Sequence, residues 1–296
     1  MKFLDLFAGI GGFRLGMESA GHECIGFCEI DKFARASYKA IHDTKGEIEL
    51  HDITTVSDDT IRGIGSVDII CGGFPCQAFS IAGNRRGFKD TRGTLFFEIA
   101  RFASILRPKY LFLENVKGLL NHENGVTFET IISTLDELGY NVEWQVLNSK
   151  NFGVPQNRER VFIIGHLRRE RTRRIFPLSG KNQSTSNQSA MKIGNINPSG
   201  NGMNGEVYQA DGLAPTLTTN KGEGQKIAIN SYHENNHLSD GFRIRKLTPK
   251  ECWRLQGFPD WTFDKAQEVN SNSQLYKQAG NSVTVNVIAA IAKELS

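Results

Sequence analysis

Short apolar runs and helical patterns alternate along the first 167 residues. The runs, which are bounded by turn residues, predict buried strands at 3–7, 23–29, 67–72, 110–113, 142–147 and 160–165. Apolar positions with helical spacing predict helices between them, at 13–20, 32–41, 96–106 and 128–138. Because strands and helices alternate, the pattern predicts a doubly wound α/β sheet.

The pattern changes after about residue 174. Residues 179–205 are rich in Ser, Asn, Gln and Gly and have almost no apolar periodicity. Two interpretations remain open, namely a mobile linker and a loop-rich surface that becomes ordered against a partner. Regular spacing returns at 241, with a short helix at 247–257 and a final helix at 282–295.

The composition excludes several protein classes. Of the 296 residues, 39% are hydrophobic and 23% are charged, and the formal net charge is +3. These values are close to the average for globular proteins, which excludes wholesale disorder, a collagen-like fibre and a disulfide scaffold. No apolar run approaches the roughly 20 residues of a spanning helix, so a membrane protein is also excluded.

The N-terminal stretch 1–13 places one lysine before an apolar run, as signal peptides do. Asp5 and Arg14 interrupt the run, and no small-residue cleavage site follows. The five cysteines are odd in number and form no CxxC pair, which favours free thiols over disulfides or zinc. We therefore expect a cytosolic protein without a metal.

The charge is distributed unevenly. Residues 168–245 contain eleven Lys or Arg against six Asp or Glu, although the whole chain carries only +3. A basic segment attached to a mildly acidic body favours a polyanionic partner, although basic patches are often only solvated faces.

The first candidate site is the sequence DLFAGIGGF at 5–13, a predicted strand that runs into a glycine turn. Glycines permit a tight turn with room for a ligand, and Glu29 at the next strand end can accept hydrogen bonds from ribose hydroxyls. Arg14 stands where a dinucleotide fingerprint has its third glycine. The pattern therefore favours a nucleoside without a pyrophosphate; the alternative is a plain structural turn.

The second candidate site is GGFPCQAFS at 72–80, directly after a predicted strand. Cys76 follows Pro75 at the rim of the sheet, where α/β ligands bind, whereas Cys71 lies inside the strand and is expected in the core. A thiol at its ordinary pKa is mostly protonated at neutral pH, so Cys76 needs local activation to act as a nucleophile.

The third candidate site is Glu114-Asn115-Val116, at another strand end on the same rim. A carboxyl group there suits general acid catalysis beside Cys76, and a carboxylate that satisfies the next helical turn is the alternative. The fourth is the sequence PQNRER at 155–160. Arg158 and Arg160, spaced by two, can present fork-shaped donors on one side of a strand, or they can form a surface salt-bridge ladder.

These four motifs, in this order, resemble those of the DNA cytosine-5 methyltransferase family. The sequences RKLTP at 245–249 and QAGNSV at 278–283 match two further blocks of that family. The resemblance covers about 1–167 and 243–296. It implies an α/β fold, a Rossmann-like S-adenosylmethionine-dependent methyltransferase sheet with a second, smaller, loop-rich target-recognition domain. The expected catalytic domain is 1–174 plus 275–296, and the expected recognition domain is 175–274.

The resemblance implies catalytic roles for four residues. Cys76 matches the family's nucleophile, which attacks C6 of cytosine so that C5 can accept a methyl group. Glu114 matches the acid that engages N3 and the exocyclic amine of the base. Arg160 and Arg158 would hold the cytosine O2 and orient the ring.

The resemblance also implies S-adenosyl-L-methionine as the cofactor, S-adenosyl-L-homocysteine as its product, and no metal. Glu29 would bind the ribose, Ile30 would pack on the adenine, and Asp52 would contact the adenine amino group. Asn281 and Val283 would close the pocket. The full set of expected cofactor residues is Asp5, Phe7, Ala8, Gly9, Gly11, Gly12, Glu29, Ile30, Asp52, Ile53, Pro75, Asn281 and Val283.

The implied partner is double-stranded DNA, from which the target base must be flipped out. Residues 80–93 resemble the family's catalytic loop, Asn204 could fill the space that the base leaves, and Thr216 could contact the backbone. An ordinary solvated basic loop is the alternative for 80–93. The expected DNA-binding residues are Ser80, Arg85, Arg86, Lys89, Gln156, Asn204 and Thr216.

The resemblance further suggests a monomer of the bacterial cytoplasm, associated with the nucleoid during activity, with a cognate restriction endonuclease as a possible partner. Three other functions remain open: an RNA cytosine methyltransferase, a catalytically silent DNA-binding module and a nicotinamide dehydrogenase with a reactive cysteine. The sequence at 74–80 looks like the DNA enzymes, and a silent module would need neither Cys76 nor Glu114.

Overall fold

The computed structural model of the chain describes residues 1–75, 95–180, 191–197, 205–210, 212–217, 225–232 and 238–295. The chain divides into two compact units. Unit 1 contains Met1–Leu147, Glu159–Ser179 and Val287–Ser296, and unit 2 contains Asn148–Arg158 and Gly180–Asn286. In the described part of the chain, no helix is both long enough and apolar enough to cross a membrane.

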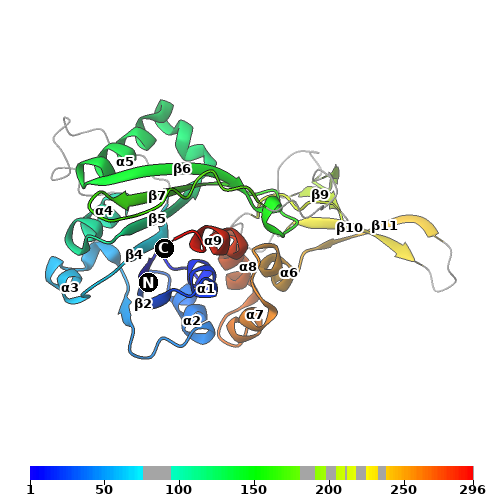
Figure 1. Ribbon diagram of the computed structural model, residues 1–296. Helices are drawn as coiled ribbons and strands as arrows, with labels where there is room; N and C mark the ends of the chain where they lie inside the picture. Colours follow the sequence, from blue (N-terminus) through cyan, green and yellow to red (C-terminus); the bar gives the residue numbers. More distant parts are fainter. Residues whose placement is uncertain are drawn as a thin grey trace. The chain divides into compact units, whose positions relative to one another are not determined.

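Unit 1 is built on a seven-stranded sheet with the order β3-β2-β1-β4-β5-β7-β6 (Figure 1). Its strands are β1 (Lys2–Leu6), β2 (Glu23–Cys28), β3 (Ile48–Leu50), β4 (Ile69–Gly73), β5 (Tyr110–Val116), β6 (Tyr140–Asn148) and β7 (Glu159–Leu167). Strands β3, β2, β1, β4 and β5 pair in parallel, so their carboxyl ends lie on one edge. The chain leaves β1 in one direction for β2 and returns on its other side for β4, which makes the β1–β4 boundary the switch point of the sheet.

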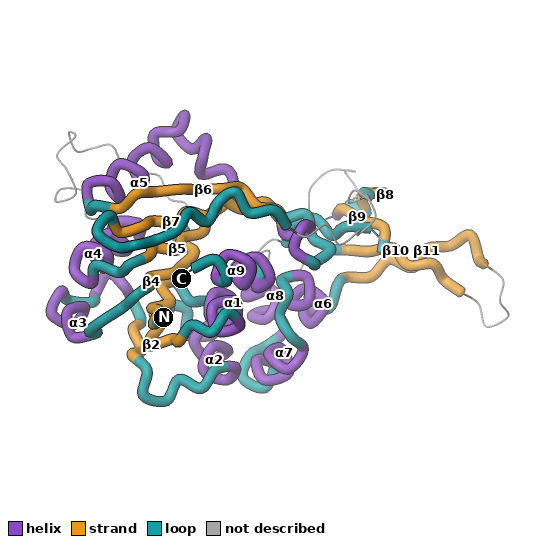
Figure 2. Tube along the Cα trace, viewed as in Figure 1, coloured by secondary structure: helices purple, strands orange, loops and turns teal. Residues whose placement is uncertain are grey.

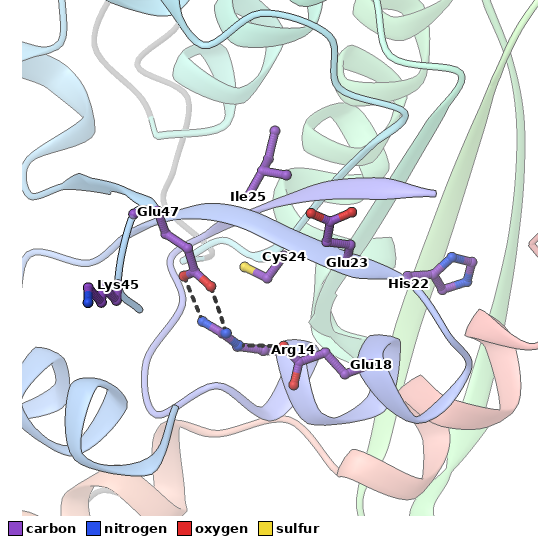
Figure 3. A pocket seen from close by; sticks show the side chains of 9 residues that line it. Arg14, Glu18, His22, Glu23, Cys24, Ile25, Lys45 and Glu47 are labelled. Carbon is purple, nitrogen blue, oxygen red and sulfur yellow. Dashed lines mark hydrogen bonds and ion pairs between the residues drawn. The ribbon is translucent and has the colours of Figure 1, made fainter. Parts of the chain in front are cut away.

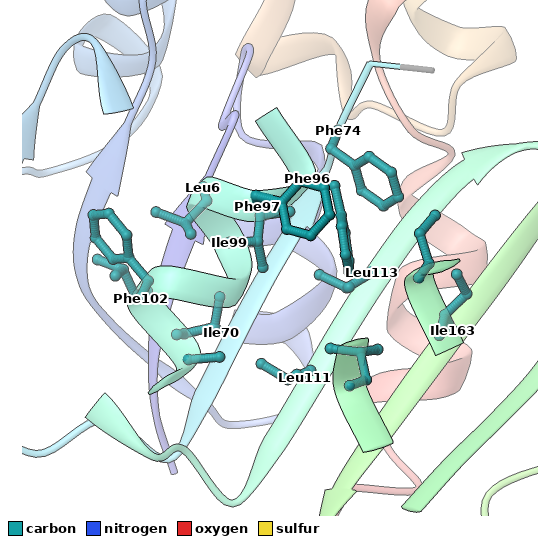
Figure 4. Packing of buried hydrophobic residues seen from close by; sticks show 14 of the residues in the cluster. Leu6, Ile70, Phe74, Phe96, Phe97, Ile99, Phe102, Leu111, Leu113 and Ile163 are labelled. Atoms are coloured by element: carbon teal, nitrogen blue, oxygen red, sulfur yellow. The ribbon is translucent and has the colours of Figure 1, made fainter. Parts of the chain in front are cut away.

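Helices cover both faces of this sheet. They are α1 (Gly12–Ser19), α2 (Lys32–Ile41), α3 (Asp58–Gly63), α4 (Leu95–Leu106), α5 (Val126–Glu137) and α9 (Val285–Ala292), with short 3-10 turns at Ile53–Thr55 and Lys117–Gly125. A third 3-10 turn, Ser149–Phe152, belongs to unit 2. On one face, Leu6 and Leu111 share a buried cluster with Phe96 and Phe102 of α4 (Figure 4). This arrangement follows from the alternation of side chains along a strand, which sends every second residue to the same face.

The other face is covered by α1 and α2. Phe13 of α1 meets Phe112 of β5 edge-on, with ring centroids 5.0 Å apart, and Tyr38 of α2 stacks on Phe27 of β2 at 4.3 Å. The predicted doubly wound α/β architecture is confirmed.

One strand differs from the expectation of a parallel sheet. Strand β7 runs antiparallel to β5, with Tyr110 opposite His166 and Val116 opposite Arg160. The connection from β6 to β7 covers only 149–158, whereas a crossover between parallel neighbours needs a dozen or more residues. A short connection therefore returns the chain in the opposite direction, and this property was not visible in the apolar pattern.

Unit 2 combines a small sheet with three helices. Its strands are β8 (Lys192–Asn195), β9 (Glu206–Gln209), β10 (Lys226–Tyr232) and β11 (Leu238–Lys246), in the order β11-β10-β9-β8. Figure 2 shows β10 and β11 as a long antiparallel ribbon. The helices are α6 (Pro249–Leu255), α7 (Asp260–Ala266) and α8 (Asn272–Asn281). Because β8 lies within 179–205 and β9 follows it directly, the Ser- and Asn-rich stretch is more than a linker.

The core of the helical part of unit 2 forms around Trp253. Its indole is buried against the rings of Phe258 and Phe263, and Nε1 donates to the carbonyl oxygen of Leu275 at 3.0 Å. Helix α6 begins where the sequence predicts, because Thr248 and Glu251 form a capping box with Pro249 at the first turn.

Because α1 and α9 are in close contact at Gly16, replacing this glycine by alanine should destabilise the protein. A Cβ on Gly16 would lie 2.6 Å from Ile288 and 2.9 Å from the backbone nitrogen of Ala289. We expect Gly16→Ala to lower the free energy of unfolding by about 1–3 kcal/mol through overpacking. Gly63→Ala, whose added Cβ has no atom within 4 Å, should instead leave stability unchanged or raise it by about 0.5–1 kcal/mol. Denaturant titration measures both, and equal effects would contradict the contact.

The start of α6 predicts a pH-dependent contribution to stability. Two hydrogen bonds from Arg245, at 2.7 and 2.9 Å, lower the pKa of Glu251 from 4.5 to about 2. A carboxyl whose pKa is lower in the folded state stabilises above its unfolded pKa, and this contribution disappears as the pH falls from about 4.5 towards 2.

Glu251→Gln keeps the capping box and removes the charge. We expect it to lower the free energy of unfolding by about 0.5–1 kcal/mol at pH 7. The difference from the wild type should shrink as the pH falls below 4.5, which denaturant titrations at several pH values would show. Glu159→Gln, which removes the partner of Lys117 at an exposed pair, is the control. A Glu251→Gln difference that stays constant down to pH 3 would contradict the assignment.

Candidate active site

The candidate site lies at the switch point in unit 1, where β1 and β4 end side by side. Leu6 pairs with Gly72 in parallel register, and a Cβ on Gly72 would lie 2.2 Å from the carbonyl oxygen of Leu6. Only glycine permits this close approach of the two strands. The segment after β1 is the glycine turn, and the segment after β4 leads through Phe74 and Pro75 towards Cys76.

The glycine turn leaves β1 through a series of left-handed backbone conformations. Phe7 has φ 56°, Gly9 has φ 56° and Gly11 has φ 85°. Positive φ at a bulky residue such as Phe7 is uncommon, and such strain collects at ligand sites. Among the residues that the structure describes, no atom lies within 4 Å of the position that a Cβ on Gly9 would occupy. The turn therefore presents open backbone at Gly9 beside the end of the sheet.

Glu29 fixes this turn to the end of β2. Its Oε2 accepts a hydrogen bond from the backbone N–H of Gly9 at 2.7 Å, and its Oε1 accepts one from Asp31 at 2.8 Å. Burial raises the pKa of Glu29 above its usual value. Each carboxylate oxygen has a further lone pair, so the group can also accept from ligand hydroxyls.

Three other expected cofactor residues surround Glu29 in different environments. Ile30 is 67% exposed, which is unusual for a large aliphatic side chain at the end of a buried strand. Asp52 caps the turn that follows it, and hydrogen bonds from Thr54 lower its pKa. Ile53 is buried in the hydrophobic core. An exposed apolar side chain next to Glu29 in the sequence suits the adenine and ribose of a nucleoside.

Asp5 and Ala8 are buried, whereas Phe7 and Gly9 are only partly buried. Asp5 is fully buried in β1, where its Oδ2 accepts a hydrogen bond from the Tyr38 hydroxyl at 3.4 Å, and burial raises its pKa well above the usual value. Ala8 is also buried and donates its backbone N–H to Cys28 at 3.0 Å. The structure thus places the Asp5 side chain behind the turn rather than at its open side.

Glu114 and Arg160 form an ion pair at the end of β5. Glu114 lies beside Gly73 of β4, and its Oε1 is 3.0 Å from Nε of Arg160 on the antiparallel strand β7. The two side chains are only 10% and 15% exposed, and burial lowers the pKa of Arg160. The adjacent Glu159 pairs with Lys117 on the exposed side of the strand. Arg160 therefore belongs to a buried pair and not to a surface salt-bridge ladder.

Asn115 is a residue whose role the sequence analysis missed. Its side-chain amide is buried and donates to the carbonyl oxygen of Phe74 at 2.9 Å, while its Oδ1 accepts from the N–H of Val116 at 2.8 Å. Phe74 precedes Cys76 by two residues. Asn115 therefore anchors the segment that carries the thiol to the strand that carries Glu114. An amide directly after an acid at a strand end was the available signal.

Arg158 lies in unit 2 and has different partners from Arg160. Its buried guanidinium donates to the carbonyl oxygens of Ser282 at 2.7 Å and Gly280 at 3.4 Å. These carbonyls flank Asn281, whose side chain is exposed, and precede the buried Val283. The expectation that both arginines present their donors together is not what the structure shows, since Arg158 holds the backbone around Asn281.

Gln156 and Thr216 also lie in unit 2. Gln156 forms an isolated parallel bridge with Ala214, and the Thr216 hydroxyl donates to the carbonyl oxygen of Asn157 at 2.8 Å. Gln156 is fully buried, yet within the described residues neither its amide nitrogen nor its amide oxygen has a hydrogen-bond partner. The remaining expected residues lie outside the described residues. They are Cys76, Ser80, Arg85, Arg86, Lys89 and Asn204.

The described residues contain no group of three or more His, Cys, Asp or Glu side chains that could hold a metal ion. The four cysteines among them, Cys24, Cys28, Cys71 and Cys252, are buried free thiols. Cys71 lies in β4, as the sequence predicts for a core residue.

Comparison with known proteins identifies the family of the chain. A family model described as C-5 cytosine-specific DNA methylase matches residues 1–213 and 181–296. The chain belongs to this family. The protein is thus a DNA (cytosine-5-)-methyltransferase, a class of enzyme found in restriction-modification systems.

Several relatives are similar over almost the whole chain. The type II methyltransferase M.HhaI of Haemophilus parahaemolyticus is 38% identical and covers 99% of this chain and 93% of its own length. M.HpaII of Haemophilus parainfluenzae is 39% identical, with 99% and 88% covered, and the orphan methyltransferase M.SPRI of Bacillus phage SPR is 33% identical, with 100% and 97% covered. The Dnmt2 methyltransferase of S. pombe shares the fold, with TM-score 0.71, 21% identity and 98% and 96% of the two chains covered.

The buried amide of Gln156 predicts a stabilising substitution. Leu has a similar size and no polar atoms, so Gln156→Leu should raise the free energy of unfolding by about 1 kcal/mol, because it removes the desolvation cost of two unpaired polar atoms. Thermal and denaturant unfolding measure this change. Gln256 is the matched control, because it is equally buried but its amide bonds Ala279 and Thr284. Gln256→Leu should destabilise, and the same sign for both variants would contradict the interpretation.

Proposed function

We propose that this methyltransferase uses S-adenosyl-L-methionine to methylate C5 of a cytosine flipped out of duplex DNA, through a covalent bond between Cys76 and C6 of the base. The observation that carries the proposal is the hydrogen bond that joins the segment after β4 to the end of β5. Asn115 ties the Phe74 carbonyl to β5, and the neighbouring Glu114 is held by Arg160 at 3.0 Å. This coupling supports a thiol and an acid that act on the same ring.

The proposed chemistry follows from the two groups. The Cys76 thiolate forms a bond to C6, and electron density moves towards C5 and N3. Glu114 hydrogen-bonds N3 and the exocyclic amine, which offsets the charge that develops on the ring. C5 would accept the methyl group with S-adenosyl-L-homocysteine as the leaving group. A base then removes the C5 proton, and the electron pair of the C5–H bond forms the C5–C6 double bond and expels the Cys76 sulfur. These steps yield 5-methylcytosine and restore the thiolate.

Arg160 would contact both Glu114 and the cytosine. Its Nε is engaged by Glu114, and the guanidinium has further N–H groups that can donate to the cytosine O2. Arg158 would act on a different element, since it fixes the backbone around Asn281. We therefore assign Arg160 to the base and Arg158 to the positioning of Asn281.

The residues around the glycine turn fit S-adenosylmethionine, which supplies a methyl group on a sulfonium sulfur when bound. Open backbone at Gly9 leaves space for the ligand, Glu29 can accept from ribose hydroxyls, and Ile30 offers an exposed apolar surface to the adenine. Asp52 can accept from the adenine amino group. Phe7, Gly11, Gly12 and Pro75 line the same edge of the sheet, and Asn281 and Val283 are assigned to the closure of the pocket.

The DNA would be held by the loop 80–93 and by the recognition domain. Asn204 is assigned to the space left by the flipped base. Contacts with the DNA backbone are assigned to Ser80, Arg85, Arg86, Lys89, Gln156 and Thr216. We assign 175–274 to target recognition and 1–174 with 275–296 to catalysis. The separate fold of unit 2, with its four-stranded sheet, supports a recognition domain. Its bounds differ from this division, because unit 2 also contains 148–158 and 275–286.

The names of the relatives support two biological settings. M.HhaI and M.HpaII are named as type II methyltransferases, and M.SPRI is named as an orphan methyltransferase of a phage. We propose a monomer that acts on a short specific sequence in bacterial DNA, with a cognate endonuclease in the type II setting.

A methyl-transfer assay tests this function. Duplex DNA of diverse sequence is incubated with the protein and tritium-labelled S-adenosylmethionine, and bisulfite sequencing then locates the product. We expect incorporation into DNA and a loss of about a thousandfold or more in Cys76→Ser. Glu114→Gln should lower kcat by about 10²–10³, whereas the control Glu159→Gln, at an exposed pair on β7, should leave kcat unchanged.

Three outcomes would contradict the proposal in different ways. Transfer to transfer RNA and none to DNA would favour the RNA methyltransferase. DNA binding without any transfer would favour a silent binding module. Full activity of Cys76→Ser would overturn the nucleophile. A duplex that carries 5-fluorocytosine tests the covalent bond directly, because the base has no C5 proton to lose and the Cys76 adduct should persist.

A further inference from the structure

Arg14 occupies the position at which a dinucleotide fingerprint would have its third glycine, and its side chain is only 6% exposed. From helix α1 its guanidinium donates to both carboxylate oxygens of Glu47, at 2.7 and 2.8 Å, and to the carbonyl oxygen of Asp43 at 3.1 Å. Its Nε donates to Glu18 at 2.7 Å. Figure 3 shows the Arg14 side chain between Glu18 and Glu47.

Arg14 binds Asp43 and Glu47, in the segment that directly follows His42. Through His42, this segment supports the glycine turn. His42, at the end of α2, lies directly beneath Gly11, because a Cβ on Gly11 would be 2.1 Å from its Nε2. The His42 ring packs against Tyr38 at 4.7 Å, and the Arg14 guanidinium lies over the Tyr38 ring at 5.5 Å. The Tyr38 hydroxyl in turn donates to Asp5 of β1. Arg14 therefore contacts Tyr38 directly and fixes the segment that follows His42.

An open pocket of about 530 Å³ adjoins the pair and is lined by charged residues, among them Glu18, Glu23 and Lys45 (Figure 3). A separate anion site there is not supported, since the Arg14 guanidinium is already engaged by Glu47, Glu18 and a backbone carbonyl. Nor does burial of the pair argue for stability alone, because a buried ion pair often stabilises no more than apolar residues of the same volume. What a bidentate pair does supply is geometry.

We propose that Arg14 and Glu47 are positioning residues for the cofactor: their ion pair holds the segment from His42 to Glu47 in place beneath the glycine turn and so sets the affinity for S-adenosylmethionine. This inference rests on the proposed cofactor. Neither side chain needs to touch the ligand, because both act through His42 and Tyr38, which support the glycine turn. The chemical step depends on Cys76 and Glu114 and should not change.

The test compares Glu47→Gln with Glu49→Gln. Glu47→Gln keeps the size of the side chain and removes its charge, whereas Glu49→Gln removes the partner of Lys39 at a solvent-exposed pair nearby. Calorimetry measures the Kd of the full-length protein for S-adenosylmethionine and S-adenosylhomocysteine. We expect about tenfold weaker binding of both ligands in Glu47→Gln, as for the loss of a charge-assisted hydrogen bond, and no change in Glu49→Gln. The kcat at saturating cofactor should stay within about twofold.

A second variant separates positioning from folding. Arg14→Met combined with Glu47→Leu replaces the pair by apolar residues, so the protein should remain folded but lose the fixed geometry. Its circular dichroism and unfolding transition should resemble the wild type while its Kd rises at least as much as in Glu47→Gln. Wild-type affinity in this folded double variant would overturn the inference. Failure of the wild type itself to bind S-adenosylmethionine would instead overturn the proposed function and this inference with it.

Discussion

The left-handed turn after β1 is the constraint on which the rest of the site depends. The chain must leave a buried strand at the switch point and enter α1 while its backbone remains open to a ligand. Positive φ angles at Phe7, Gly9 and Gly11 achieve this, and the conformation persists only because its surroundings hold it. Glu29 holds the turn from the end of β2 through the N–H of Gly9, and His42 supports it from below.

A second set of contacts connects the turn to the chemistry. The close approach of Gly72 to the Leu6 carbonyl brings β4 against β1, so the segment that leads to Cys76 starts beside the glycine turn. Asn115 then ties that segment to β5, where Glu114 and Arg160 form their buried pair. Three neighbouring strands therefore lead, in order, into the glycine turn, the segment before Cys76 and Glu114, to which we assign the cofactor, the nucleophile and the acid. Parallel strands make this possible because their carboxyl ends share one edge.

The sequence was sufficient for the parts of this arrangement that depend on local pattern. Apolar runs and helical spacing predicted the strands and helices of unit 1 except the short strand β3 and the short helix α3. The strand-end position of Glu114 predicted that it would lie on the rim. Contacts between distant segments were not predictable in the same way. Asn115 and Phe74 are 41 residues apart, and Arg14 and Glu47 are 33 residues apart, and no periodicity relates the two members of either pair.

Strand direction and unit membership were also beyond the sequence pattern. An apolar run has the same composition whether its strand is parallel or antiparallel, so β7 was recognised but not its direction. Arg158 and Arg160 are two residues apart and suggested a shared role, yet the chain passes from unit 2 to unit 1 between them. Their guanidinium groups accordingly bind a backbone segment in one unit and a carboxylate in the other.

The replacement of a fingerprint glycine by Arg14 also explains why α1 suits a nucleoside and not a dinucleotide. In dinucleotide sites the third glycine lets the helix pack closely on the strand, and the N-terminus of that helix receives the pyrophosphate. Here the close-packing glycine of α1 is Gly16, which faces Ile288 of α9. The face at Arg14 is instead filled by a guanidinium that binds Glu47. The helix is thus fixed by α9 on one side and by the segment below the turn on the other, and its position does not depend on a phosphate at its N-terminus.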